Sequence, residues 1–242
     1  MAKAPTTRPD ARPLYEQVRL ILIERIQSGH WPPAAALPSE FELAAELGVS
    51  QGTVRKALDG LAEAGIVVRR QGRGTFVVEH TPQHVLFRFF SIYDETGEQV
   101  LPDSLPASVR TAAASAAERA KLGLDKGAEV IRIRRIRTRR GAPFIHETIV
   151  LPAALFPDLG KTDVPNTLYD LFQKVYGVLV AHTDERITAV AASPVDSKAL
   201  DVAAGAPLLH IDRVTFDIEH RPVEWRRSTC NLRDAHYLSR LR

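Results

Sequence analysis

The chain has 242 residues, 45% of them hydrophobic and 25% charged, which is typical of folded protein and allows two domains of ordinary size. Its formal net charge of +3 excludes a histone-like polycation, so any nucleic-acid binding has to come from local placement of charge. One cysteine, Cys230, excludes an internal disulfide and an all-cysteine metal site, and no apolar run reaches the roughly 18 residues of a membrane helix. We therefore expect a cytoplasmic protein without a membrane partner.

The first predicted helix covers residues 14–28. Residues 1–13 contain three prolines and no apolar segment of the signal-peptide kind, so we expect them to form a disordered tail. Pro13 suits the start of a helix, and Gly29 follows as a stop signal. Between them, apolar residues recur on one helical face: Leu14, Val18, Ile21, Leu22 and Ile26.

Two more helices follow, separated by a tight turn at Gly48. Ser39 is a good N-cap for the first of them, and Glu42 lies three residues further on, as a capping box requires. Ser50 caps the next helix, which is expected to run to about Ala64. The first is expected to bury Phe41, Leu43, Ala44 and Leu47, and the second Val54, Leu58 and Leu61.

The N-terminal end of the third helix carries residues that face largely outward: Gln51, Gly52, Thr53, Arg55 and Lys56. Recognition helices present such residues to base edges in the major groove. Two short β-rich runs follow at 66–68 and 75–78. The tip between them, 69–74, combines arginines with two glycines that allow the backbone to approach a phosphate or a minor groove closely. In this order, the elements predict a winged helix-turn-helix over residues 14–79.

Each of these elements alone has an ordinary structural explanation. A capped helix pair with a glycine turn is common in all-α proteins, and a basic hairpin tip is usually a solvated turn. The order of the elements and the local charge favour DNA binding. Residues 50–78 hold five basic and two acidic side chains, a local charge as large as that of the whole chain.

Four motifs resemble the GntR family of bacterial regulators: PLYEQV at 13–18, LPSE at 37–40, GVSxxTVRKAL at 48–58 and GRGTFV at 72–77. The resemblance implies a homodimer that reads an inverted-repeat operator in double-stranded DNA. The predicted DNA-binding residues are Ser39, Gln51, Gly52, Thr53, Arg55, Lys56, Arg70, Gly72 and Arg73. The sequence departs from the family at Phe41 and Gln51, where arginine is usual. Gln51 can still pair with adenine, whereas Phe41 offers only apolar contact.

Residues 80–86 are predicted to be a linker, and residues 87–242 a second domain. Strands are expected at 86–93, 131–139, 144–151, 178–189, 208–216 and 222–231, and helices at 111–122, 166–176 and 195–202. Residues 121–135 align without a gap with residues 199–213, each segment forming a helix end, a glycine turn and a strand. Such junctions look alike in general. We nevertheless interpret the match as two similar units in one antiparallel sheet with helices on one face, an α+β domain.

Charged residues interrupt the apolar face of two predicted strands. Arg135 and Arg137 continue the apolar face of residues 131–133, and Glu147 lies on the apolar side of residues 144–151. Buried charges need partners. Either an arginine pairs with Glu147 across the hairpin as a structural salt bridge, or these side chains line a cleft that binds a small anion through a guanidinium fork. Strand periodicity supports both interpretations.

Four further motifs resemble the UTRA ligand-sensing domain of HutC-type GntR regulators: RIR at 135–137, GAPFIHET at 141–148, TLYDLF at 167–172 and RPVEW at 221–225. The resemblance implies a chorismate-lyase-like fold in which the effector is surrounded by Phe90, Ser91, Arg135, Arg137, Glu147, Tyr169 and Glu224.

The function expected from both resemblances is transcription regulation, with repression favoured over activation and operator binding modulated by a small anionic metabolite. Organic acids, amino-acid derivatives, phosphosugars and urocanate suit the arginines equally well. No metal or cofactor motif is present, so we expect neither, and we do not expect an enzyme. Two alternatives stay open: a chorismate-lyase-like enzyme, and a constitutive DNA-binding protein without an effector.

Overall fold

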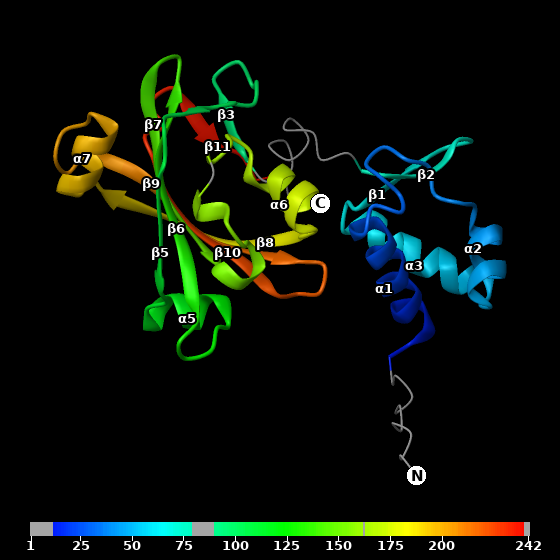
Figure 1. Cartoon of the computed structure of the whole chain (residues 1–242). Coiled ribbons are helices and arrows are strands. Elements are labelled where there is room, and N and C mark those ends of the chain that lie inside the picture. Colours follow the sequence, from blue (N-terminus) through cyan, green and yellow to red (C-terminus); the bar gives the residue numbers. More distant parts are fainter. Residues whose placement is uncertain (1–11, 79–89, 162, 240–242) are drawn as a thin grey trace, which may run out of the picture. The chain divides into compact units, whose positions relative to one another are not determined.

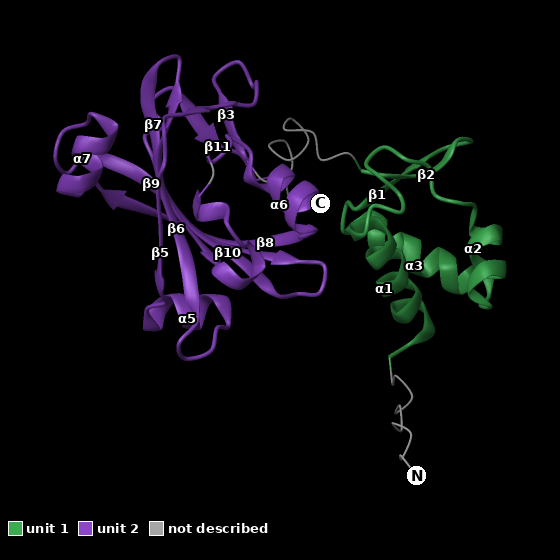
Figure 2. Cartoon of the chain, in the orientation of Figure 1, with its two compact units in different colours: residues 1–79 green, residues 80–242 purple. Residues whose placement is uncertain are grey.

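The computed structural model describes residues 12–78, 90–161 and 163–239. The chain forms two compact units, residues 1–79 (unit 1) and 80–242 (unit 2), shown in different colours in Figure 2. Most of the predicted tail and all of the predicted linker lie outside the described residues. No helix in the described part of the chain is both long and apolar enough to cross a membrane.

Unit 1 contains three helices and a two-stranded antiparallel sheet (Figure 1). Its elements are α1 (Leu14–Gln27), α2 (Glu40–Leu47), α3 (Gln51–Glu63), β1 (Val67–Arg70) and β2 (Gly74–Val77). The predicted caps form: Ser39 and Glu42 make the capping box of α2, Gly48 ends that helix with φ 64°, and the side chain of Ser50 accepts from the amide of Thr53. The winged helix-turn-helix order of elements is therefore confirmed.

The core of unit 1 forms where the three helices meet. Its most buried side chains include Leu22, Leu43, Val54, Leu58 and Leu61. The prediction that Phe41 is buried is wrong, because its side chain is 73% exposed. Positions two residues apart in a helix point to different sides, so the side of α2 that turns Leu43 inward turns Phe41 outward.

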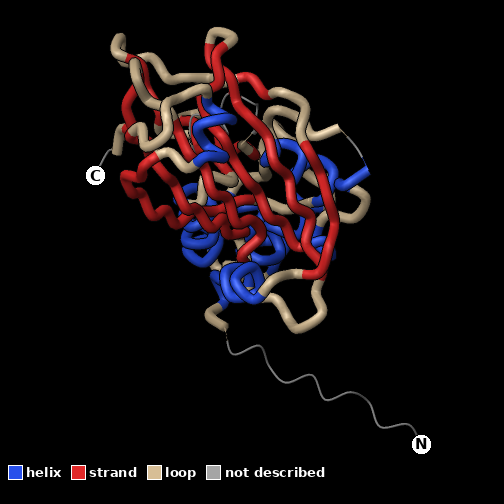
Figure 3. Tube along the Cα trace, turned by 90° about the vertical axis from the view of Figure 1, so that its left-hand side faces the viewer, coloured by secondary structure: helices blue, strands red, loops and turns tan. Residues whose placement is uncertain are grey.

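Unit 2 is built around a seven-stranded antiparallel sheet, whose strands run side by side in Figure 3. The strand order is β4-β6-β7-β10-β9-β8, and β5 also pairs with β6. The strands of this sheet are β4 (Asp103–Ser104), β5 (Ser108–Ala113), β6 (Glu129–Arg139), β7 (Ala142–Pro152), β8 (Val180–Ala191), β9 (Pro207–Asp217) and β10 (Pro222–Cys230). A separate pair is formed by β3 (Ile92–Asp94) and β11 (Ala235–Tyr237). Strand 86–93 was predicted here, but most of it lies outside the described residues.

Helices cover both faces of the sheet, not one face as predicted. The helices are α5 (Ala116–Leu122), α6 (Leu168–Tyr176) and α7 (Pro194–Leu200), with short 3-10 turns at Ala153–Leu155 and Leu159–Lys161. Phe172 of α6 packs in one cluster with Ile133 and Ile149, whereas Leu122 at the end of α5 packs with Val150 and Trp225 on the other face. Figure 1 shows α6 and α7 on opposite sides of the sheet.

The similarity between residues 121–135 and 199–213 corresponds to two structural repeats within unit 2: β5–α5–β6–β7 is the first repeat and β8–α7–β9–β10 is the second. Each helix ends in a left-handed residue, Gly123 or Asp201, and leads into the next long strand. Helix α5 of the first repeat packs on β10 of the second repeat, and α7 of the second repeat packs on β7 of the first. The α+β prediction is confirmed, with one local error: residues 111–113, predicted as the start of a helix, belong to β5. The capping box of Ser115 and Glu118 starts the helix later, and pairing with β6 sets the conformation of the preceding residues.

Candidate functional site

The exposed end of α3 presents most of the predicted DNA-binding residues of unit 1. Gln51, Gly52, Arg55 and Lys56 are exposed, and Thr53 is half-buried with its hydroxyl 2.8 Å from that of Ser50. Ser39 and the β1–β2 tip with Arg70, Gly72 and Arg73 line a neighbouring groove of about 520 Å³. The fold therefore brings the nine predicted residues onto α3 and the adjoining groove.

Two glycines allow close approach of the backbone at this surface. Gly72 has φ 69°, a left-handed conformation that other residues adopt at a cost, and a Cβ atom there would meet no heavy atom within 4 Å. Gly52 lies inside α3, where a Cβ atom would meet only the hydroxyl of Ser50 at 3.8 Å. Glycine weakens a helix interior, and the surroundings of position 52 leave room for a side chain, so packing within unit 1 does not require this glycine.

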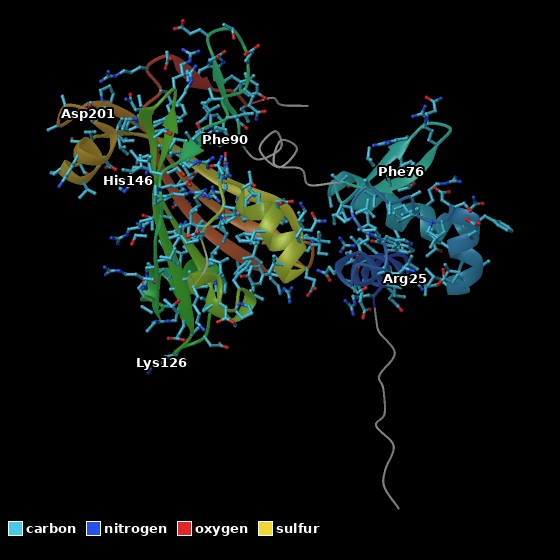
Figure 4. The ribbon with its side chains drawn as sticks, turned by 45° about the horizontal axis from the view of Figure 1, so that its top comes forward. Arg25, Phe76, Phe90, Lys126, His146 and Asp201 are labelled. Atoms are coloured by element: carbon cyan, nitrogen blue, oxygen red, sulfur yellow. The ribbon has the colours of Figure 1, made fainter. Side chains whose placement is uncertain are left out.

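The basic side chains of this surface are held by their neighbours. The Nε atom of Arg55 donates to Glu40 Oε2 at 2.9 Å, and the Arg55 side chain remains 58% exposed. The ammonium of Lys56 lies 3.9 Å from the ring centre of Tyr15. The guanidinium of Arg70 lies 4.7 Å from the ring of Phe76, which Figure 4 labels on β2. Cation–π contacts of this kind order long side chains while leaving their charge accessible.

In unit 2, strand alternation places the predicted effector residues on the face of the sheet that α6 covers. Arg135 and Arg137 of β6, Glu147 of β7 and Glu224 of β10 are each at most 3% exposed. Arg135 lies directly opposite Glu147 in the β6–β7 register and forms a salt bridge with it, and an Arg137 nitrogen lies 3.7 Å from the same carboxylate. The ion pair across the hairpin that the sequence allowed is therefore present.

Arg226 of β10 joins the two glutamates. It lies 3.4 Å from Glu147 and 2.8 Å from Glu224, and the hydroxyl of Tyr169 on α6 donates to Glu224 at 2.9 Å. On the next strands, Arg213 Nε donates to Glu185 Oε1 at 2.6 Å. We refer to these seven charged residues as the buried ion cluster: Arg135, Arg137, Arg213, Arg226, Glu147, Glu185 and Glu224.

The pKa values in the cluster follow from burial and charge. Burial alone would raise the pKa of Glu147, but Arg135, Arg226 and Arg137 outweigh it and hold that pKa well below its usual range. Burial lowers the pKa of Arg137 to about 10, against the opposing effect of Glu147. Both groups are therefore charged at neutral pH, and Glu147 acts as an anionic partner and not as a proton donor.

The first residues of unit 2 after the undescribed segment, Phe90 and Ser91, also reach this region. They line a cavity of about 20 Å³ together with Glu147, Arg213 and Arg226. A volume of that size holds about one water molecule, well below the roughly 300 Å³ of a typical ligand pocket. All seven predicted effector residues thus lie in or beside the cluster, in a closed arrangement.

Other candidate groups lie elsewhere. His146, labelled in Figure 4, points to the opposite face of the sheet from Glu147, where its Nδ1 lies 3.0 Å from Asp196 of α7. Cys230 is fully buried, and burial raises the pKa of its thiol, which argues against a nucleophile. Within the described residues, no group of histidine, cysteine and acidic side chains could hold a metal ion.

Sequence comparison assigns both units. A family model described as "Bacterial regulatory proteins, gntR family" matches residues 14–77, and one for the UTRA domain matches residues 102–235. The histidine utilization repressor of Pseudomonas putida is 34% identical over 206 residues, which cover 84% of this chain and 82% of that protein. This chain belongs to the gntR family of bacterial regulators. It is therefore a DNA-binding transcription regulator whose UTRA domain responds to an effector.

Further relatives of this GntR–UTRA regulator cover nearly its full length. The repressor NagR of Bacillus subtilis is 27% identical over 235 residues, 95% of this chain and 96% of NagR. Among solved structures, the ligand-binding domain of a GntR-family regulator from Bordetella bronchiseptica has a TM-score of 0.58 at 31% identity, covering 64% of this chain and 98% of that one. PhnF of Mycobacterium smegmatis, at 24% identity and TM-score 0.55 over 93% of this chain and 99% of PhnF, shares the fold.

Three cluster residues of this regulator were not singled out from the sequence: Arg226, Arg213 and Glu185. A signal for Arg226 was present, because it lies two residues after Glu224 and strand alternation places both on one face. Arg213 and Glu185 required the pairing of β8 with β9, which sets them opposite each other. That register depends on long-range contacts that local patterns do not encode.

Proposed function

We propose that this regulator is a repressor that binds an inverted-repeat operator as a homodimer and releases it when a small anion enters the buried ion cluster. In unit 1, Arg55 and Gln51 read base edges, while Arg70, Arg73 and the glycine tip contact the backbone. The relatives named histidine utilization repressor and NagR support repression. The same proposal places the protein in the cytoplasm and assigns it no enzyme activity.

The observation that carries the effector site is the charge of the cluster. Among the described residues, the cluster contains four buried or nearly buried guanidinium groups and three carboxylates, so these seven side chains together carry a net charge of +1. In addition, the Nε atom of Arg137 is buried without a hydrogen-bond partner. An unpaired donor in a cationic, apolar-walled site is costly, and a carboxylate or phosphate group would satisfy both deficits.

The closed cavity indicates how such an anion could act on the protein. A ligand larger than a water molecule has to displace existing contacts, above all those between Glu147 and the arginines. The same arginines hold backbone carbonyls of two connecting segments: Arg137 donates to Pro102 at 3.0 Å, and Arg135 donates to Pro165 at 3.1 Å. Ligand entry would therefore shift these segments and Phe90–Ser91, which follow the linker, and so favour one arrangement of the reading heads.

Lysine substitutions test this site, because they keep the charge and remove the planar fork. Arg137→Lys and Arg135→Lys are expected to retain operator binding but to lose at least about tenfold in sensitivity to the effector, since lysine cannot make bidentate contacts. The measurement is release of a fluorescent operator duplex during titration with urocanate, glucose 6-phosphate or neutral glucose. Wild-type protein should respond to one of the anions and not to glucose.

Two comparisons complete this experiment. Arg134→Lys, an exposed position on the opposite face of β6, should leave the response unchanged. A normal response of both Arg135→Lys and Arg137→Lys would instead assign the arginines a purely structural role. Turnover of chorismate by the wild-type protein would revive the enzyme alternative, and the lack of any metabolite effect on melting or DNA release would favour a constitutive DNA-binding protein.

The homodimer has its own test. Sedimentation equilibrium of the full chain should give about twice the chain mass of 26.7 kDa at micromolar concentration. The selected operator should contain two half-sites whose centres lie about one or two DNA turns apart, because two-fold symmetry of the protein is mirrored in the DNA. A monomer that binds a single half-site with full affinity would contradict this part of the proposal.

A further inference from the structure

Glu40 lies where the three DNA-facing elements of unit 1 meet. It is the first residue of α2, and its side chain is only 15% exposed. One carboxylate oxygen accepts from Arg55 Nε on α3 at 2.9 Å, and the other lies 3.0 Å from an Arg69 nitrogen on β1. Arg69 also forms a salt bridge of 2.7 Å with Asp59 of α3. The carboxylate of Glu40 therefore joins α2 to α3 and to the wing.

Glu40 lies in the first turn of α2, where the helix dipole favours a negative charge, but this does not account for its contacts with two arginines on other elements. The capping box of α2 is completed by Ser39 and Glu42, and Glu40 takes no part in it. Glu40 lines the groove that contains the glycine tip of the wing, a surface expected to face phosphates. A carboxylate there opposes DNA binding by charge repulsion, which favours a role that outweighs the repulsion.

The mode of contact between Glu40 and Arg55 points to that role. Glu40 accepts a hydrogen bond from the Nε atom of Arg55, and within the described residues the two terminal nitrogens of Arg55 donate no hydrogen bond. A guanidinium held at Nε keeps its two terminal NH₂ groups for guanine O6 and N7, the most frequent specific contact in the major groove. Fixing the side chain before binding also reduces the entropy lost on complex formation.

We propose that Glu40 is a positioning residue for DNA recognition: it orients the fork of Arg55 toward a base pair and fixes the wing relative to the recognition helix through Arg69. This inference rests on the proposed base contact of Arg55. The proposal assigns Glu40 no base contact of its own, since each of its carboxylate oxygens is turned to an arginine.

The test compares discrimination with overall affinity. Duplexes are first selected from a random pool with the full-length wild-type protein. Binding is then measured by fluorescence anisotropy on the selected duplex, on variants with single base-pair changes, and on a scrambled duplex. Glu40→Gln should reduce discrimination about tenfold at the base pair that Arg55→Ala no longer reads. Affinity for the scrambled duplex should stay equal or increase, because a negative charge has been removed.

Two further variants separate positioning from other effects. Glu46→Gln removes the same charge from the same helix, where Glu46 pairs with Arg25 at 2.6 Å, and should preserve discrimination. In the Arg55→Ala background, Glu40→Gln should cause no further loss, because the two residues act through one contact.

Three outcomes would overturn the inference: unchanged discrimination in Glu40→Gln, an equal loss on selected and scrambled duplexes, or full additivity with Arg55→Ala. An equal loss accompanied by a lower melting temperature would assign Glu40 a structural role, and additivity would assign it a base contact of its own. If Arg55→Ala itself kept full discrimination, the proposed base contact of Arg55 would be at fault, not only the role of Glu40.

Discussion

Replacing Arg55 by alanine is expected to remove sequence-specific DNA binding while leaving the fold and the proposed dimer intact. The Arg55 side chain is 58% exposed, and Glu40, with which it pairs, would still pair with Arg69, so little stability is lost. A bidentate pair with a base is worth about 1–3 kcal/mol, and a homodimer would lose two of them. Affinity for the selected duplex should therefore fall roughly 30-fold to 20,000-fold. Affinity for a scrambled duplex should fall far less.

Arg73→Ala is the matched comparison for this prediction. Arg73 lies at the exposed tip of the wing, where a phosphate contact is proposed. Its loss should weaken binding to selected and scrambled duplexes by the same factor and reduce the salt dependence of binding by about one counterion per site. If Arg55→Ala behaved in this uniform way, Arg55 would be a backbone contact and base reading would have to be assigned to Gln51 or Thr53.

The DNA-binding unit could be predicted closely from the sequence because its signals are local. Ser39, Glu42, Gly48 and Ser50 each satisfy or end a backbone hydrogen-bond pattern within a few residues, so position in the sequence determines conformation. Phe41 was misplaced because an apolar residue beside a buried face was assumed to be buried. Its outward position, where relatives of this type are expected to carry arginine, leaves an apolar side chain at a polar surface.

The sensing unit was only partly predictable. Alternation along β6 and β7 was sufficient to place Arg135 and Glu147 on one buried face, because the period of a strand is fixed. Residues 111–113 were assigned to a helix because the alanine-rich sequence that begins there favours one, whereas pairing with β6 makes them the end of β5. Strand alternation places Arg226 on the same face as Glu224, but its contact with Glu147 follows only from the position of β10 between β7 and β9.

The arginines proposed for the two sites lie in different surroundings, and their exposure separates them. Arg55 is ordered by one carboxylate but remains open to solvent, which suits a contact made and broken with DNA. Arg135 and Arg137 are buried among apolar side chains, where each charge depends on its neighbours. A change in one cluster partner therefore has consequences for all of them, and these consequences are measurable as stability.

Glu147→Gln is expected to give the largest loss of stability among the charged residues of unit 2. Glu147 is 2% exposed and is in contact with Arg135, Arg137 and Arg226, so a neutral side chain leaves these charges uncompensated in a buried site. Removing one partner of a buried ion pair costs about 3–5 kcal/mol. Urea unfolding at pH 7 would measure this, with Trp31 replaced by Phe so that Trp225 reports on unit 2 alone.

The difference in free energy of unfolding between wild-type protein and Glu147→Gln should decrease as the solution becomes acid. The folded pKa of Glu147 lies well below the ordinary carboxyl value of 4.5, so its contribution is complete above that value and declines as the pH falls below it. Other carboxylates with a lowered pKa, such as Glu118 at about 2, titrate in wild-type and variant alike and cancel in the comparison. The stability gap should therefore be constant between pH 7 and about 5 and should narrow in more acid solution.

Two further measurements test whether the stabilising role of Glu147 is related to effector binding: a control substitution at an exposed carboxylate and a titration with inorganic anions. Glu219→Gln removes a carboxylate that is 39% exposed, and it should cost less than about 1 kcal/mol at pH 7. Phosphate or sulfate should stabilise Glu147→Gln more than wild-type protein, because the variant leaves the surrounding guanidinium groups without their main anion. Two results would show that Glu147 is not the counter-ion that an effector has to replace. One is a difference in unfolding free energy below about 1 kcal/mol between wild-type protein and Glu147→Gln, and the other is a difference that changes neither with pH nor with added anions.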